Sequence, residues 1–164
     1  MTYEVEKEWI TAAGFKATVV LSDGHRCGYV GVPEGHPLHG VSYNEHTPNV
    51  RPVGAAEPFG KRGILSLLTA DMEHQRLDII FDVHGSLTFS NTRKDGGALW
   101  WFGFDCAHSD DLPSPEWLAK QPAVMKGLYS HRTGEHRSLD YCVQECESLA
   151  QQIVERTIAA GDLK

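Results

Sequence analysis

One apolar stripe near the C-terminal end constrains the fold of this chain more than any other feature. From Ser138 onward, apolar residues recur at the three- and four-residue spacing of an α-helix, and Gly161 lies beyond the last of them. The stripe consists of Leu139, Cys142, Val143, Cys146, Leu149, Ala150 and Ile153. A single amphipathic helix buries such a stripe against another layer, and most of the other regular patterns are those of strands. The sequence therefore predicts a helix packed across a sheet.

The segment VVLSDGHRCGYV has the pattern of a β-hairpin. Two β-rich runs flank Asp23-Gly24, a preferred pair for a two-residue type I′ turn. Such a turn sets Ser22 opposite His25 and fixes which side chains share a face. The predicted core face collects Phe15, Ala17, Val19, Leu21, Val30 and Val32, and the other face collects Lys16, Thr18, Val20, Cys27 and Tyr29.

Two further runs alternate at the two-residue period of a strand. They are FDVHGSLTFS, residues 81–90, and ALWWFGFDC, residues 98–106, with a turn-rich linker between them. We expect them to pair antiparallel in a register that brings their apolar faces together. That register places Phe89 by Trp100, Leu87 by Phe102 and Gly85 by Phe104. It also sets His84 directly opposite Asp105.

The remaining segments are shorter or irregular. Ser114 as N-cap and Pro115 at the first helical position predict a short helix that ends before Pro122. Residues 33–63 contain five prolines and are predicted to be a long loop, while residues 64–74 have a weak helical pattern. The expected fold class is α+β. We expect a single domain over residues 1–164, with an antiparallel sheet of four or more strands and the long C-terminal helix packed across one face.

The stretch WWFGFDCAHSDD, residues 100–111, points to a site because it combines a strand's aromatics with ionisable side chains at the strand's end. The predicted register leaves a polar face away from the helix, where Gly103 would form a depression between Trp101 and Asp105. The predicted ligand-binding residues are His84, Ser86, Thr88, Trp101, Asp105, His108 and Tyr29. The competing interpretation is a half-buried second face on which His84 only satisfies Asp105 and the proline-rich loop covers Trp101.

Three chemistries compete at this site. Asp105, Cys106, His108, Asp110 and Asp111 with His84 offer zinc donors, but their spacing is irregular and Cys142 and Cys146 fit the helix stripe. We therefore expect no stoichiometric zinc and no cofactor. Cys106 could be a nucleophile, but it alternates onto the apolar face, away from His84 and Asp105. General acid–base work by a His84–Asp105 pair is geometrically easier and stays an alternative.

Composition excludes several classes of partner. The chain has 15 basic and 22 acidic residues, a formal charge of −7, so we expect no sequence-independent binding to DNA or RNA. The first residues lack the basic flank and apolar core of a signal peptide, and no apolar run is long enough to span a bilayer. We expect a cytoplasmic protein without membrane contact, and four cysteines that are free thiols.

Four motifs resemble those of a family of small phage- and prophage-encoded proteins with no assigned catalytic residues. They are GYVGVPEGHPLHG (28–40), VHGSLTFS (83–90), WWFGFDCAHSDD (100–111) and RSLDYCVQECESLA (137–150). The resemblance implies an accessory role in the cytosol of an infected host cell. Small proteins in that setting often hold or destroy nucleotide-derived signals of bacterial defence.

The leading hypothesis is that the chain binds a small planar, nucleotide-derived ligand. Trp101 or Tyr29 would stack on a base, and His84 and Asp105 would bond to ribose or base edges. Arg26, or Lys61 and Arg62 of the loop, would meet a phosphate. One alternative is an acid–base or metal-assisted hydrolase that uses the same face, and another is an inhibitor that binds a host protein through the aromatic patch. A homo-oligomer also stays open.

Overall fold

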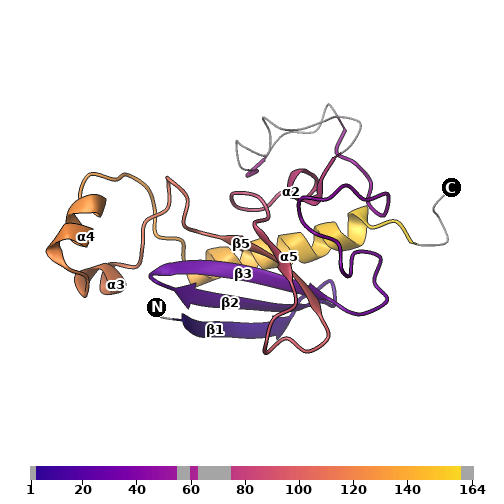
Figure 1. Cartoon of the computed structure of the whole chain (residues 1–164), viewed down its shortest axis with the longest axis horizontal. Coiled ribbons are helices and arrows are strands. Elements are labelled where there is room, and N and C mark those ends of the chain that lie inside the picture. Colours follow the sequence, from indigo (N-terminus) through magenta and orange to yellow (C-terminus); the bar gives the residue numbers. More distant parts are fainter. Residues whose placement is uncertain (1–2, 55–59, 63–74, 160–164) are drawn as a thin grey trace.

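A five-stranded sheet and the long helix α5 (Leu139–Arg156) form the body of the computed structural model, which describes residues 3–54, 60–62 and 75–159. The strands are β1 (Tyr3–Ile10), β2 (Lys16–Ser22), β3 (His25–Val32), β4 (Phe89–Asn91) and β5 (Trp100–Asp105). Their order is β1-β2-β3-β5-β4, and each neighbouring pair is antiparallel. Figure 1 shows α5 running along one face of this sheet. The predicted α+β class is confirmed.

The hairpin of β2 and β3 has the predicted turn and register. Asp23 and Gly24 both have positive φ, 46° and 83°, as a type I′ turn requires, and Ser22 pairs with His25. The predicted core face contains fully buried side chains: Ala17, Val19, Val30 and Val32. Thr18 and Val20 on the opposite face are also fully buried, so that face is less open than the alternation alone indicates.

Helix α5 covers the sheet as its apolar stripe predicts. The Ser138 hydroxyl caps its first turn by accepting a hydrogen bond from the Tyr141 amide at 3.0 Å. Five residues of the stripe are buried: Cys142, Cys146, Leu149, Ala150 and Ile153. Gly28 of β3 makes the close approach possible, because a Cβ there would lie 2.8 Å from Cys146 Sγ and would overlap the ring of Phe104.

The predicted register of the β4–β5 pair is wrong. Phe89 pairs with Gly103 instead of Trp100, three positions further along β5, and the strand covers Phe89–Asn91 alone. Residues 81–88, which were also predicted as strand, are not part of it. The physical reason is the backbone of Gly85 and Ser86, whose φ values of 65° and 70° are left-handed and incompatible with a strand. Phe102 and Phe104 nevertheless lie in the core, as predicted.

The described connecting segments contain three short helices and a long irregular loop. Helix α2 (Leu77–Ile80) precedes β4, and α3 (Pro115–Ala119) begins at the predicted N-cap, where Ser114 Oγ accepts from the Trp117 amide at 3.3 Å. Helix α4 (Ala123–Tyr129), which was not predicted, lies beside α3 beyond one end of the sheet (Figure 1). Residues 33–54 of the predicted loop contain turns and isolated bridges.

Three further expectations concern a predicted helix, membrane-spanning segments and the cysteines. The helix expected at residues 64–74 lies outside the described residues. Within the described part of the chain, no helix is long and apolar enough to cross a bilayer. The four cysteines, Cys27, Cys106, Cys142 and Cys146, are free thiols, as predicted.

Replacing Phe102 by alanine tests the helix–sheet core. Because Phe102 is fully buried, we expect the substitution to lower the free energy of unfolding by about 3 to 5 kcal/mol. Leu128→Ala on α4 is the control, since Leu128 is 66% exposed and should cost less than about 0.5 kcal/mol. Urea denaturation followed by circular dichroism measures both, and equal losses would contradict the assignment.

Candidate functional site

Four separate segments of the chain meet in a polar cleft of about 490 Å³. They are residues 61 and 62, the turn after α2, the loop after β5, and the start of α5 with the residue before its N-cap. The lining residues are Lys61, Arg62, His84, Gly85, His108, Ser109, Asp110, Arg137 and Tyr141. No single sequence motif supplies the cleft, because its lining residues come from several motifs that lie far apart in the chain.

His84 forms the floor of the cleft and is held by both ring nitrogens. Its Nε2 lies 2.8 Å from Asp111 Oδ2, and its Nδ1 lies 2.8 Å from the hydroxyl of Tyr141. The His84 backbone amide also donates to Glu145 Oε1 at 2.9 Å. The side chain is 8% exposed. These contacts fix the orientation of the ring.

Asp111 is the buried anion of the site. Its Oδ1 accepts from Arg137 Nε at 2.9 Å, and its Oδ2 accepts from the His108 amide at 3.0 Å. Burial by itself would raise the pKa of the carboxyl, but the hydrogen bonds from Arg137 and His84 outweigh it and hold the pKa below its ordinary value. Asp111 is therefore a carboxylate at neutral pH.

Arg137 joins this buried anion to the rim of the cleft. Its Nε bonds Asp111, while its two terminal nitrogens lie 3.2 Å from Asp110 Oδ2 and 3.1 Å from Glu135 Oε2. The guanidinium also lies 5.2 Å from the ring centre of Tyr141. The hydrogen bond to Asp111 raises the pKa of Arg137. Asp110 and Glu135 are both exposed, so these two ion pairs are weak.

His108 lies directly over the backbone of Gly85. A Cβ at Gly85 would overlap the imidazole, and the glycine also has a φ of +65°. His108 Nδ1 is 3.4 Å from Asp111 Oδ2 and 3.8 Å from Asp105 Oδ1, and the side chain is 32% exposed. The ring centres of His108 and His84 are 5.6 Å apart. Glycine at position 85 is what lets the two rings approach.

Glu145 supports the cleft from the second turn of α5. The side chain is 5% exposed and accepts from the His84 amide and from Lys61 Nζ. Tyr141 lies one turn earlier on the same helix, and burial raises the pKa of its hydroxyl to about 12. Tyr141 is therefore a neutral hydrogen-bond partner of His84.

The predicted His84–Asp105 pair is not formed. His84 bonds Asp111 instead, while Asp105 Oδ2 accepts from Thr88 Oγ1 at 2.9 Å. The cause is the turn at Gly85 and Ser86, which delays the start of β4 to Phe89 and directs His84 toward α5. Of the seven predicted site residues, His84 and His108 line the cleft, whereas Ser86 is buried with 1% exposure.

Trp101 and Tyr29 do not line this cleft. Trp101 is 1% exposed, and its ring packs against Gly96 and the guanidinium of Arg93, so it offers no stacking surface. Gly103 forms no depression, because a Cβ there would lie 2.5 Å from Tyr29 Cδ1 and the Tyr29 ring already fills the space. Tyr29 lines a separate cavity of about 360 Å³ with Phe89 and Arg93.

Two other sequence-based assignments change. Arg26, a candidate phosphate ligand, donates to Glu6 and to the backbone oxygen of Arg137, so it acts as a structural cation. Cys106 is buried with its Sγ 3.7 Å from that of Cys142, and this hydrogen bond and burial raise its pKa. A thiol in that state is a poor nucleophile, which agrees with the expectation for Cys106.

Sequence reasoning missed Asp111 as the anchor, and it missed Arg137, Tyr141 and Glu145 altogether. A signal was present in the last two, because Tyr141 and Glu145 stand four residues apart, each directly before a cysteine of the buried stripe. Polar residues at that position on a helix flank its buried face. Arg137 stands next to the N-cap and has no comparable signal.

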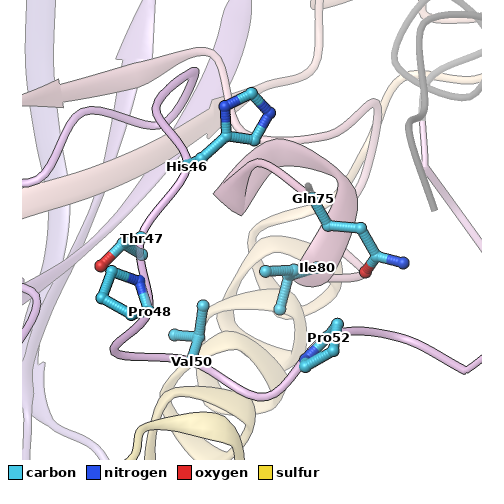
Figure 2. A pocket seen from close by; sticks show the side chains of 7 residues that line it. All are labelled: His46, Thr47, Pro48, Val50, Pro52, Gln75 and Ile80. Carbon is cyan, nitrogen blue, oxygen red and sulfur yellow. The ribbon is translucent and has the colours of Figure 1, made fainter. Parts of the chain in front are cut away.

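A third cavity, of about 390 Å³, lies beside α2, and Figure 2 shows its lining side chains facing one another across it. Proline and aliphatic side chains from residues 48–52 face Ile80. The amide of Gln75 bonds the backbone of Val53 through both its oxygen, at 2.6 Å, and its nitrogen, at 2.9 Å. This cavity does not gather the convergent polar groups of the first cleft.

Comparisons with known proteins give no further guide to the site. No family model matches the chain, and neither the curated proteins nor the solved structures contain a significant match. The chemistry of the cleft has to be inferred from its own residues.

Gly85→Ala tests the contact between His108 and the turn. Gly97→Ala is a matched control, because Gly97 has a similar φ of +62° and no atom within 4 Å of its Cβ position. The control should cost about 1 to 2 kcal/mol from backbone strain alone. Gly85→Ala should cost more and should shift the imidazole NMR resonances of His108, which the control leaves in place. Equal costs with unchanged resonances would contradict the contact.

The depressed pKa of Asp111 predicts how stability depends on pH. A carboxyl with a lower pKa in the folded state stabilises the fold above its unfolded pKa of about 4, and this stability is lost as pH falls through the folded pKa. Asp111→Asn should lower the free energy of unfolding at pH 7 by about 3 kcal/mol or more. The free energy of unfolding of Asp111→Asn should also fall less than that of the unaltered chain between pH 5 and pH 2.5. Asp95→Asn, at an exposed position, should behave like the unaltered chain in urea titrations at each pH.

Proposed function

We propose that the chain binds a small planar molecule with an anionic group, of the nucleotide class, in the cleft between His84, His108 and Tyr141. The observation that carries this proposal is the state of Arg137. Its Nε is anchored on buried Asp111, while both terminal nitrogens point to exposed carboxylates. A guanidinium held in this way is preorganised for a two-pronged hydrogen bond to a phosphate or carboxylate.

The energies of the competing contacts favour exchange. Exposed ion pairs such as those of Arg137 with Asp110 and Glu135 contribute about 0 to 1 kcal/mol each. A phosphate that receives two parallel charged hydrogen bonds gains more than this. Lys61 at the same cleft adds a second cation, although Glu145 holds it. An anionic ligand can therefore displace the surface carboxylates without disturbing the buried Asp111.

The size and lining of the cleft support a planar ligand. Its volume of about 490 Å³ is within the range of small-molecule sites, about 300 to 1,000 Å³. Three rings line it, those of His84, His108 and Tyr141, and the His108 ring is about a third exposed. Imidazole and phenol rings can stack on a base or bond to its edges. His108 takes the stacking role first assigned to Trp101 and Tyr29.

The hydrogen bonds of His84 favour binding without turnover over acid–base catalysis. Both of its ring nitrogens are bonded to Asp111 and Tyr141, so the ring positions its neighbours and does not face the cleft with a lone pair. The motif resemblance to phage-encoded proteins makes a nucleotide-derived defence signal a reasonable ligand, held intact by the protein. The aromatic patch for a host-protein inhibitor depended on Trp101, which is buried.

Hydrolysis of the same ligand is a second candidate function. The chain of contacts from half-buried Tyr141 through His84 to buried Asp111 is continuous, which is the arrangement that holds a proton in place for transfer. Incubating the protein with each nucleotide and recovering the small molecules by heat denaturation distinguishes the two. A binding protein returns the ligand intact, and a hydrolase returns products.

Removing the carboxylates that compete for Arg137 tests the binding proposal. The double substitution Asp110→Asn with Glu135→Gln should tighten the binding of a nucleotide about 2- to 10-fold, because it frees both terminal nitrogens. Arg137→Lys should weaken binding at least about 10-fold, since an ammonium cannot keep the Asp111 contact and still offer two donors.

Isothermal titration with nucleoside mono- and diphosphates and cyclic dinucleotides gives the affinities, with Glu116→Gln as the control for charge away from the cleft. Glu116 is exposed on α3. A double variant that binds no more tightly than this control, or no binding of any nucleotide at 1 mM, would overturn the proposal.

A further inference from the structure

We propose that His84, His108 and Asp111 form a binding site for a divalent transition metal ion, Zn²⁺ foremost, at the floor of the cleft. This inference goes beyond the proposed function and does not depend on it. One donor atom from each residue lies within 4.8 Å of the other two. Two imidazoles and one carboxylate are a donor set suited to Zn²⁺ and related ions.

The donor atoms are close to the spacing that a metal imposes. His84 Nε2 is 2.8 Å from Asp111 Oδ2, and His108 Nδ1 is 3.4 Å from the same oxygen. Tetrahedral zinc with bonds of about 2.0 Å sets its ligand atoms about 3.3 Å apart. Small movements of the side chains would therefore make room for the ion. Metal binding through Nε2 needs the neutral tautomer of His84 that is protonated on Nδ1, so the Nε2 proton would leave to solvent and Nδ1 would take one up and donate it to the Tyr141 hydroxyl.

The outer contacts of the site are those that metal ligands usually have. The second nitrogen of His84 bonds the Tyr141 hydroxyl at 2.8 Å, and the second oxygen of Asp111 accepts from Arg137 Nε at 2.9 Å. Such partners fix the orientation of a ligand and select the tautomer that presents its lone pair to the ion. His84 Nε2 and Asp111 Oδ2 thus face the metal while the protein holds the other nitrogen and oxygen, although Oδ2 also accepts from the His108 amide at 3.0 Å.

His108 supplies an independent observation. Its Nδ1 is buried and has no hydrogen-bond partner among the residues that the structure describes, although Asp111 Oδ2 is 3.4 Å away. A buried polar nitrogen without a partner is costly and calls for an explanation. A metal ion between Nδ1 and Asp111 Oδ2 would satisfy it.

The local charges tolerate the ion. The positive charge of Arg137 repels a nearby cation. Three carboxylates, those of Asp110, Asp111 and Glu135, pair with Arg137, so these four side chains together have a net negative charge. Asp105 adds another carboxylate, 3.8 Å from His108 Nδ1. The sequence-based expectation of no bound metal depended on spacing along the chain. Folding brings together donors from two separate segments, and three protein ligands leave one position toward the cleft, as catalytic zinc sites do.

Zinc binding by variants tests the site. Chain treated with EDTA and dialysed should take up one Zn²⁺ with micromolar or tighter affinity, measured by competition with a chromophoric chelator. His108→Ala should weaken this at least 100-fold, whereas His131→Ala, at an exposed histidine outside the cleft, should leave it unchanged. Tyr141→Phe should weaken it about 10- to 100-fold, since it removes the outer partner of His84.

Cobalt gives a second readout that does not depend on the chelator. One equivalent of Co²⁺ should produce visible absorption bands of a four- or five-coordinate ion, and Zn²⁺ should abolish them. The absence of stoichiometric uptake, or equal losses in His108→Ala and His131→Ala, would overturn the metal site. Nucleotide titrations in EDTA measure the proposed ligand separately, so failure of one proposal is distinguishable from failure of the other. Circular dichroism of each variant confirms that it is folded.

Discussion

The buried carboxylate of Asp111 is the interaction on which the cleft depends. A lone anion in a protein interior is strongly disfavoured, and Asp111 is fully buried. It is stable there because Arg137, His84 and the His108 amide all donate to it. These partners belong to the turn before β4, the loop after β5 and the start of α5. One charge thus joins three segments outside the five-stranded sheet, two of which also share backbone hydrogen bonds at the Asp111–Glu135 bridge.

Helix and sheet supply the rigid frame for that charge. The Ser138 cap starts α5 at a fixed residue, and the cysteine stripe presses the helix onto β3 through the space left by Gly28. This packing fixes where Arg137 and Tyr141 emerge from the helix. Two backbone positions without side-chain bulk therefore matter for the site: Gly28 for the helix and Gly85 for the His108 ring.

The prediction of the site failed at one turn, for a physical reason. Alternation in FDVHGSLTFS is a correct description of the residue pattern, but Gly85 and Ser86 adopt left-handed φ values that a pattern cannot reveal. Because the strand then starts at Phe89, pairing moves three positions along β5 and His84 turns toward α5. When side chains are assigned to a face from the two-residue period alone, a turn inside the segment makes the assignment wrong.

The sequence by itself determined the elements whose signals are local. The Asp23-Gly24 turn, the Ser114 and Ser138 caps, the α5 stripe and the burial of Phe102 and Phe104 all follow from neighbouring residues, and the structure has each of them. Tertiary structure alone decided the site, because His84 contacts Asp111, 27 residues further along the chain, and Tyr141, 57 residues further along. Contacts between distant residues depend on how whole segments pack, and no local periodicity records that.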